Sequence, residues 1–315
     1  MAELNPIKYP IPYIQFVQEL DLIRIAVAFP FLIYASMADW RTRRVRNIVW
    51  ADLGIIALFL LWVDSYMANA PLLAQSVLLP IAFFFADIFW QKKGGLWSKA
   101  GMTSAALYIA SFIWIAYIGY LVQIGGLYWS QVSAPFVAFF LIIIFEIFYM
   151  FDVIKGGADA KAVICLAILL PTYPQIIDGI PLISPGFDLV LTFFPVALST
   201  LFMGAVISLC LPIYYYLKNS GRGERAEWRT FLSMDMPIDE VEKHHVWLVE
   251  WVEDGKIKAN YRKVRDSETL KADLAALKER GLKKARITYK IPFIIPLTIG
   301  LAEVLTIGNL LFLAY

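Results

Sequence analysis

Residues 133–153 read SAPFVAFFLIIIFEIFYMFDV, and an apolar run of this length is sufficient to cross a lipid bilayer as a helix. Similar runs recur along the chain, which is 60% hydrophobic and only 17% charged, with a mean hydropathy of +0.65. Soluble globular domains are closer to about 25% charged. The sequence therefore predicts a polytopic membrane protein whose membrane part is all-α.

Apolar runs of this kind occur at eight places, and seven is the main alternative count. The sixth run is short and ends at Pro171, whereas the seventh is long enough to project into water. The first follows Glu19 and Asp21 rather than a basic segment, so it is interpreted as a span and not as a cleavable signal. The eight predicted spans are residues 22–39, 47–66, 71–90, 102–123, 133–153, 159–174, 188–217 and 291–314.

Lys and Arg are concentrated in alternate connections between these spans. The connections after the first, third and fifth spans are basic, whereas those near residues 65–70, 124–132 and 175–187 contain neither Lys nor Arg. Basic loops are retained on the cytoplasmic side of a membrane. The odd-numbered spans are therefore expected to end in the cytoplasm of a multi-pass protein of the cell membrane, with both termini outside.

Residues 218–290 contain 17 of the 28 basic and 13 of the 26 acidic residues. This composition predicts a small α+β cytoplasmic domain between a membrane core at 1–217 and a last span within 291–315. Aromatic content favours a strand over a short helix in one of its segments. The expected elements are a helix start at 237–240, a strand at 244–252, a helix at 267–280 capped by Ser267 and ended by Gly281, and a strand at 286–289.

Metal ions, cofactors and nucleic acid are not indicated. The net charge of +2 gives no reason to expect a polyanionic partner. Cys165 and Cys210 lie inside apolar stretches, where cysteine is usually a small core residue. His244 and His245 are adjacent, and a pair of neighbouring histidines is a poor metal site, so both are expected to be solvated or structural.

Acidic residues in or beside the spans are the functional candidates, because charge is costly inside a membrane. Those near an interface have a simple structural explanation, whereas an inter-helix hydrogen bond explains Glu146 and Glu303 about as well as a functional role does. The candidates are Asp39, Asp52, Asp64, Asp87, Glu146, Asp152, Asp159 and Glu303.

Two of these acids have a distinctive sequence context. Asp39 ends the first span and is followed by a basic hairpin, TRRVRN at 42–47. Asp159 follows Gly156 and Gly157, which permit an irregular turn, and it falls at a helix N-terminus where free N–H groups can orient a carboxylate. The other explanation is that Asp39 pairs with a nearby Arg and that Asp159 only caps its helix.

The two contexts together resemble the type IV prepilin peptidase family, and in particular its archaeal preflagellin and prepilin peptidases. The residues that carry the resemblance are Asp39, Arg43, Val45 and Asn47 in the first motif, and Gly156, Gly157, Ala158, Asp159 and Lys161 in the second. Further similarity lies in Met236-Pro237, in His245 to Leu248, in Glu250 and in the run from Lys290 to Gly300. The resemblance touches most of the chain.

Two features depart from the family pattern. Ala158 replaces a glycine, which fits the archaeal motif better than the bacterial one. Asp39 and Asp159 are 120 positions apart, with four predicted spans between them, where two are usual for the family. The extra pair keeps both acids on the same side of the membrane, but it makes Asp87 a reserve candidate for the first acid.

The resemblance implies an aspartic endopeptidase with Asp39 and Asp159 as its catalytic pair. Gly156, Gly157, Ala158, Lys161, Arg43 and Asn47 are then motif or substrate-positioning residues. The implied substrate is a pilin-like or archaellin precursor, cut between a short basic leader and an apolar helix at the cytoplasmic face. The N-methyltransferase activity of bacterial members is not expected, because the four cysteines of their zinc-binding segment are missing.

Two carboxylates suit this chemistry because, when held close, they cannot both ionise and so share one proton. The ionised member takes a proton from water, and the protonated member stabilises charge on the scissile carbonyl oxygen. Since the pair titrates as a unit, the sequence assigns neither role to either acid.

Two other functions stay open. The segment Tyr149 to Asp152 faintly resembles the first-acid motif of presenilin-like and signal-peptide-peptidase-like proteases, but only seven residues separate Asp152 from Asp159. An ion-coupled transporter would suit the glycine-interrupted helix at Gly156-Gly157, although no inverted repeat is visible.

Overall fold

A computed structural model describes residues 11–89, 99–174, 182, 195–220, 228–253, 256–260 and 269–308. The chain divides into two compact units. The helical unit comprises Met1–Gly204 and Ile294–Tyr315, and the sheet unit comprises Ala205–Phe293. The domain boundaries at 217/218 and 290/291 stay predictions.

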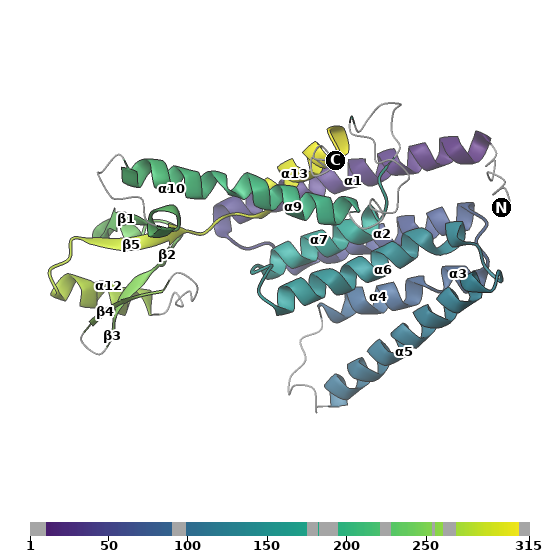
Figure 1. The fold of residues 1–315 in the computed structure, drawn as a ribbon, viewed down its shortest axis with the longest axis horizontal. Coiled ribbons are helices and arrows are strands. Elements are labelled where there is room, and N and C mark those ends of the chain that lie inside the picture. The colour runs from purple at the N-terminus through teal and green to yellow at the C-terminus, as the bar shows by residue number, and fades with distance from the viewer. Residues whose placement is uncertain are drawn as a thin grey trace. The chain divides into compact units, whose positions relative to one another are not determined.

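Helices occur at each of the eight predicted spans (Figure 1). They are α1 (Ile11–Thr42), α2 (Asn47–Met67), α3 (Leu72–Gln75) with α4 (Leu78–Asp87), α5 (Lys99–Gln123), α6 (Trp129–Met150), α7 (Gly157–Leu169), α9 (Val196–Ser208) with α10 (Cys210–Ser220), and α13 (Ile294–Thr306).

Five of these helices are long and apolar enough to cross a membrane. They lie at Gln18–Thr42, Asn47–Met67, Gly101–Gln123, Trp129–Met150 and Val196–Ser220. The protein is therefore a multi-pass membrane protein, but eight spans are not confirmed. The third predicted span is interrupted at Ser76-Val77, and α7 and α13 have 13 residues each, which is a length of about 20 Å against a hydrocarbon thickness of about 30 Å.

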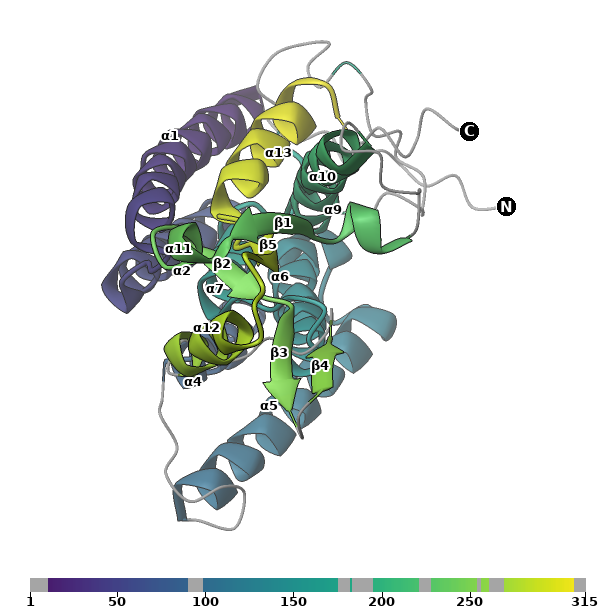
Figure 2. The same cartoon turned by 90° about the vertical axis from the view of Figure 1, so that its left-hand side faces the viewer.

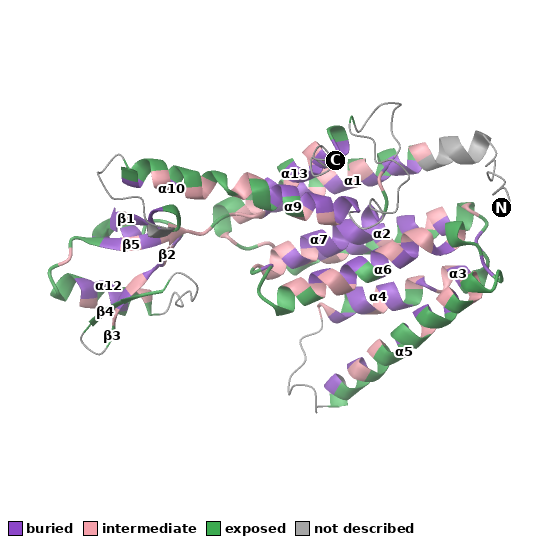
Figure 3. Cartoon of the chain, viewed as in Figure 1, coloured by how far each residue is buried: buried purple, intermediate pink, exposed green. Residues whose placement is uncertain are grey.

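The short helix α7 is almost completely enclosed by protein. Every residue from Ala162 to Leu170 is buried, and α7 packs against α2, α6 and α1 (Figure 3). A helix that is apolar on all sides is stable only when all its sides are covered. Since neighbouring helices provide this cover, α7 does not need the length of a lipid-exposed span.

The pair α4 and α5 lies at the periphery of the helical unit. Much of α5 is exposed, and it packs mainly on α4, which in turn packs on α6 (Figures 1 and 3). In contrast, α2 and α6 contact α7 directly. Of the four helical segments between Asp39 and Asp159, these peripheral helices are therefore the ones that least affect the surroundings of α7.

Backbone approaches backbone where α9 meets α13. A Cβ atom added to Gly300 would lie 2.9 Å from the backbone N of Gly204 and 3.0 Å from the carbonyl O of Thr200. Small residues allow this close packing of helices in a membrane. On another side, α13 packs against α1, where the hydroxyls of Ser36 and Thr298 share a hydrogen bond of 3.0 Å.

A buried ion cluster joins α1 to α2. The Arg24 guanidinium donates to Asp21 at 3.0 Å and to Asp64 at 2.9 Å, and only 3% of the Arg24 side chain is exposed. An unpaired charge in this environment is costly, whereas the two carboxylates compensate the guanidinium. The cluster thus fixes α1 against α2, at the end of α2 remote from Asn47.

The sheet unit is a small α+β domain, as predicted from the sequence. Besides α10 it contains a 3₁₀ turn (Trp228–Phe231), β1 (Met234–Pro237), α11 (Ile238–Val241), β2 (Val246–Leu248), β3 (Glu250–Glu253), β4 (Lys256–Ala259), α12 (Leu270–Glu279) and β5 (Lys284–Tyr289). Strand β5 lies between β1 and β2 and is antiparallel to both, and β3 and β4 form a separate hairpin (Figure 2).

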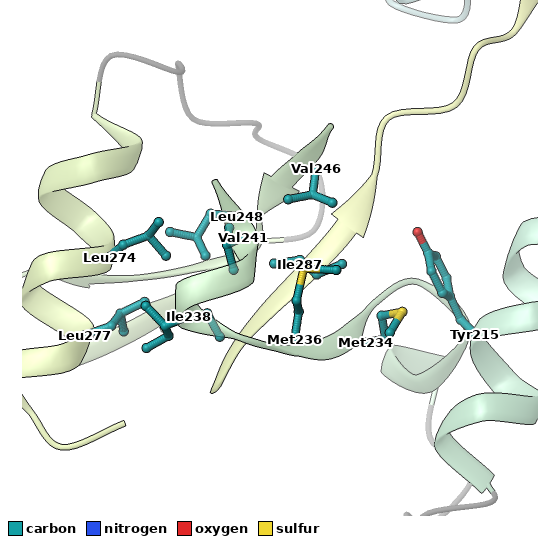
Figure 4. Close-up of a cluster of buried hydrophobic side chains, with 11 residues drawn as sticks. Tyr215, Met234, Met236, Ile238, Val241, Val246, Leu248, Leu274, Leu277 and Ile287 are labelled. Atoms are coloured by element: carbon teal, nitrogen blue, oxygen red, sulfur yellow. The ribbon is translucent and has the colours of Figure 1, made fainter. Parts of the chain in front are cut away.

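Aliphatic side chains from the sheet and α12 form the core of this unit (Figure 4). Leu274 and Leu277 of α12 pack with Ile287 of β5, and the Tyr215 hydroxyl of α10 accepts the Tyr289 N–H at 2.6 Å. Lys278 of α12 forms an ion pair with the exposed Asp239 of α11 and lowers the pKa of that carboxyl.

Most local predictions for the sheet unit are confirmed. Gly281 ends α12 with a φ of +80°, a conformation that glycine adopts without strain. The predicted strand at 244–252 is divided into β2 and β3, which pair with different partners, because the chain leaves the first sheet at Val249. The proposed cap Ser267 lies outside the described residues.

The ion cluster yields a first prediction. Replacing Arg24 by Met removes the guanidinium that Asp21 and Asp64 share, and breaking a buried pair typically costs about 3–5 kcal/mol. We expect a clearly lower midpoint of thermal unfolding for the purified variant in detergent. Arg41→Met, which removes an exposed charge from the same helix, is the control, and equal midpoints for the two variants would refute the stabilising role of the cluster.

The contact between α9 and α13 yields a second prediction. Gly300→Ala forces the two backbones apart, and overpacking of this kind costs about 1–3 kcal/mol. Gly119→Ala in α5 is the matched control, because its new Cβ would meet nothing closer than the Phe136 ring at 3.9 Å. We expect thermal unfolding at a lower temperature for Gly300→Ala only; if Gly119→Ala is equally destabilised, the close contact is not responsible.

Candidate active site

Asp39 lies in the last turn of α1, where the helix ends in a constrained turn. The N–H of Arg43 donates to the Asp39 carbonyl O at 3.0 Å, and Arg43 has a φ of 54°. A positive φ is uncommon for residues other than glycine. The Thr42 hydroxyl reinforces this turn by contacting the carbonyls of Ala38 and Arg44, both at 2.9 Å. The Asp39 side chain is half-buried.

Asp159 lies in the first turn of α7, which Gly156 caps in an extended conformation. A Cβ atom on Gly156 would overlap the Asp159 carboxylate, whereas one on Gly157 would meet only the Tyr149 hydroxyl at 3.5 Å. Gly156 is therefore required sterically: the Asp159 side chain folds back over the start of its own helix. Asp159 and Ala158 are both half-buried.

The helical unit brings these two acids together across 120 residues of sequence. The C-terminal part of α1 packs against α7, and Asp39 and Asp159 are close enough for their carboxylates to interact electrostatically. Asp39 also interacts with the Arg43 guanidinium and with the backbone N–H of Ile294, the first residue of α13. Three helix ends thus meet at one carboxylate pair.

A hydrogen bond near the Asp39–Asp159 pair joins the segment that follows Asp39 to the helix that contains Asp159. Lys161 of α7 donates from Nζ to Oδ1 of Asn47, the first residue of α2, at 2.8 Å, and the ammonium lies 5.1 Å from the centre of the Phe89 ring. Deeper in the same contact, the Cys165 thiol donates to the Trp50 carbonyl at 3.3 Å. The start of α2 and the start of α7 are therefore held to each other.

Arg43 is half-buried beside Asp39. Its guanidinium lies 5.9 Å from the centre of the Trp40 ring, and its Nε and Nη1 atoms are buried without a hydrogen-bond partner among the described residues. Buried guanidinium N–H groups normally have acceptors. The Arg43 guanidinium is therefore a half-buried charge that interacts electrostatically with Asp39.

The other acids have different surroundings. Asp52 and Asp152 are exposed, and Asp64 belongs to the Arg24 cluster. Glu146 and Glu303 are half-buried and interact electrostatically with Tyr108 and Tyr173.

Two hydroxyl groups donate hydrogen bonds to Asp87, the reserve candidate for the first acid. It is buried at the end of α4 and accepts hydrogen bonds from Ser104 at 3.0 Å and from Tyr108 at 2.8 Å. These hydroxyls tie α4 to α5, so a structural role accounts for this carboxylate.

Two features of the unit were not anticipated from the sequence. The first is Arg24, although a lone Arg inside an apolar run is itself a signal. The backbone N–H of Ile294 carries no side-chain signature at all. No cluster of three metal-ligating side chains occurs within the described ranges, and the thiols of Cys165 and Cys210 are both free.

Comparison with known proteins identifies the C-terminal part of the chain. Residues 228–310 match the family model for the Archaeal Peptidase A24 C-terminus Type II. The match begins at the 3₁₀ turn before β1 and extends past the end of α13, the helix that packs on α1 beside Asp39. No curated protein matches the chain. The matched segment supports a peptidase, and it confirms the resemblance to the archaeal prepilin and preflagellin peptidase family.

Proposed function

We propose that the protein is a membrane aspartic endopeptidase that removes the short basic leader of type IV pilin-like or archaellin precursors. The observation that carries this proposal is the meeting of Asp39 and Asp159 at the facing ends of α1 and α7. The peptidase A24 match supplies the chemical class, and two paired carboxylates are sufficient to activate water for attack on a peptide bond.

The position of the pair fits a substrate that is cut beside a membrane. Asp39 lies near the end of a helix of spanning length, and Asp159 lies at the start of a helix enclosed in the bundle. The basic segment from Arg41 to Arg46 adjoins this end, which by the distribution of Lys and Arg faces the cytoplasm of a cell membrane protein. A precursor whose apolar helix enters the bilayer would present its leader junction at this level.

Two carboxylates that share a proton can do both parts of the hydrolysis. The ionised one accepts a proton from water, and the resulting hydroxide adds to the carbonyl carbon while the protonated one hydrogen-bonds the carbonyl oxygen. No methyltransferase step is included, since neither Cys165 nor Cys210 could form the four-cysteine segment of bacterial relatives. The direct test is cleavage of a purified pilin-type precursor by the purified full chain in lipid nanodiscs, with no cut beside the leader as the contrary result.

The observed surroundings of Asp152 argue against the presenilin-like alternative. Asp152 is exposed and has a φ of 55° in the turn after α6, so it does not lie on a helix that faces α7. Asp159 therefore has Asp39, rather than Asp152, as its acidic partner within the described residues.

The dyad leads to a third prediction. Asp39→Asn and Asp159→Asn should each reduce the rate of leader cleavage at least about 100-fold, because general acid–base catalysis contributes about 10²–10⁴-fold. Asp87→Asn should retain cleavage, since its hydroxyl partners can also bond an amide. Cleavage and membrane abundance are measured together on gels. Activity lost in Asp87→Asn but kept in Asp39→Asn would move the first acid to Asp87.

The close contact between Gly156 and the Asp159 carboxylate leads to a fourth prediction. Gly156→Ala places a methyl group where the Asp159 carboxylate now lies, and displacement of a catalytic group by about 1 Å can cost 10²-fold in rate. Gly157→Ala adds the same methyl group one residue later without reaching Asp159. We expect kcat to fall far more in the first variant than in the second. A larger loss in Gly157→Ala would show that the glycines act through backbone flexibility instead.

A further inference from the structure

A groove in the sheet unit is lined mainly by charged side chains. Its volume is about 510 Å³, and sites for small ligands usually measure about 300–1,000 Å³. The charged residues that line it are Asp235 of β1, Glu250 of β3, Lys283 just before β5, and Lys284 and Arg286 within β5. The groove is therefore large enough for a ligand, and a ligand that fits it is polar.

The groove opens where two strands diverge. Strand β2 pairs with β5 only from Ile287 to Tyr289, and Val249 adds one more backbone hydrogen bond, to the Arg286 carbonyl at 2.9 Å. The chain then leaves this sheet and enters the β3–β4 hairpin (Figure 2). The first half of β5 consequently has β1 on one side and no strand of the described residues on the other.

Backbone groups of β5 are available on this open edge. In an antiparallel strand, successive residues direct their N–H and C=O groups alternately to the two sides. The Arg286 C=O accepts from Val249, and its N–H donates to the Glu250 carboxylate at 2.9 Å, in place of a backbone carbonyl. Lys284, two residues earlier, therefore directs its N–H and C=O to the same side. An unpaired strand edge of this kind can pair with another chain.

The charges around the groove favour an acidic ligand. Arg286 and Asp235 form an ion pair at 3.2 Å, so these two charges largely cancel. Lys283 and Lys284 are both exposed, and neither ammonium has an ion-pair partner within the described part of the chain. Against these two free cations stands only the Glu250 carboxylate, which already accepts a hydrogen bond. The net charge that a ligand meets is therefore positive.

We propose that the groove binds a short, extended peptide segment with acidic side chains, which adds a strand to the open edge of β5. Strand addition uses backbone hydrogen bonds for affinity and the flanking side chains for specificity. The peptide backbone exchanges hydrogen bonds with Lys284, and the acidic side chains pair with Lys283 and Lys284. This site lies within the sheet unit and does not depend on the proposed peptidase function.

The test uses the purified full chain in phosphatidylcholine nanodiscs, with a labelled short peptide of alternating Glu and Val as the probe. Binding is measured by fluorescence anisotropy. We expect saturable binding that weakens as salt is added, because exposed charges are screened. A peptide of alternating Lys and Val should not bind. Amide hydrogen exchange should also slow in the segment that contains Lys284 when the acidic peptide is present.

Matched variants separate the groove from the general charge of the unit. Lys284→Glu should weaken binding at least about tenfold, because like charges across an interface are strongly unfavourable. Lys271→Glu makes the same change at an exposed position of α12 outside the groove and should bind as the wild type does. Ala259→Phe narrows the groove without changing its charge and should also weaken binding.

A modified peptide tests the strand addition itself. Methylation of alternate backbone nitrogens keeps the acidic side chains but removes hydrogen-bond donors, so the methylated peptide should bind at least about fivefold more weakly. Equal affinity of the methylated and unmethylated peptides would refute pairing with β5.

The remaining outcomes are also decisive. Equal weakening by Lys284→Glu and Lys271→Glu would refute the groove as the site, since a diffuse positive field would then suffice. If the wild type binds no acidic probe, the proposal is wrong. Asp39→Asn should bind the peptide as the wild type does, so loss of precursor cleavage in that variant tests the peptidase function separately.

Discussion

The packing of the end of α1 against the start of α7 is the contact on which the remainder of the active-site geometry depends. It places two carboxylates close to each other at a depth where neither is fully hydrated, and like charges in such a position cannot both persist. Other contacts of the helical unit hold this arrangement. The Arg24 cluster fixes α1 on α2, the Lys161–Asn47 bond fixes α2 on α7, and α13 packs on α1 and presents an N–H to Asp39.

Helices α7 and α5 differ in how far they are exposed, and this difference explains their different positions in the helical unit. Helix α7 is too short to span a bilayer unaided but is surrounded by protein, so its N-terminus and Asp159 can lie at a site that water reaches from one end. Helix α5 is long, apolar and mostly exposed, as expected of a helix that contacts lipid. The long interval between Asp39 and Asp159 is accommodated at the periphery by α4 and α5, so it does not separate the two acids.

Hydropathy predicted where the helices lie, because burial in lipid and burial in protein both require apolar residues. For the same reason it could not tell α7, which is covered by other helices, from a true span, and it did not detect the interruption at Ser76-Val77. Local rules worked where a single residue decides the structure, as at Gly281 and Pro237. Local rules could not predict packing across the helix bundle. The pairing of Arg24 with Asp64 joins residues 40 positions apart, and the contact of Ile294 with Asp39 joins residues 255 positions apart.

The claim most open to direct measurement is that Asp39 and Asp159 meet in the membrane. Cysteines placed at both positions, with Cys165 and Cys210 replaced by Ser, would be joined by a short thiol-to-thiol cross-linking reagent only if the two side chains lie close to each other. Mass spectrometry of the digested protein identifies the linked peptides. We expect a clearly stronger link between positions 39 and 159 than between 87 and 159. A link from 87 with none from 39 would contradict this expectation.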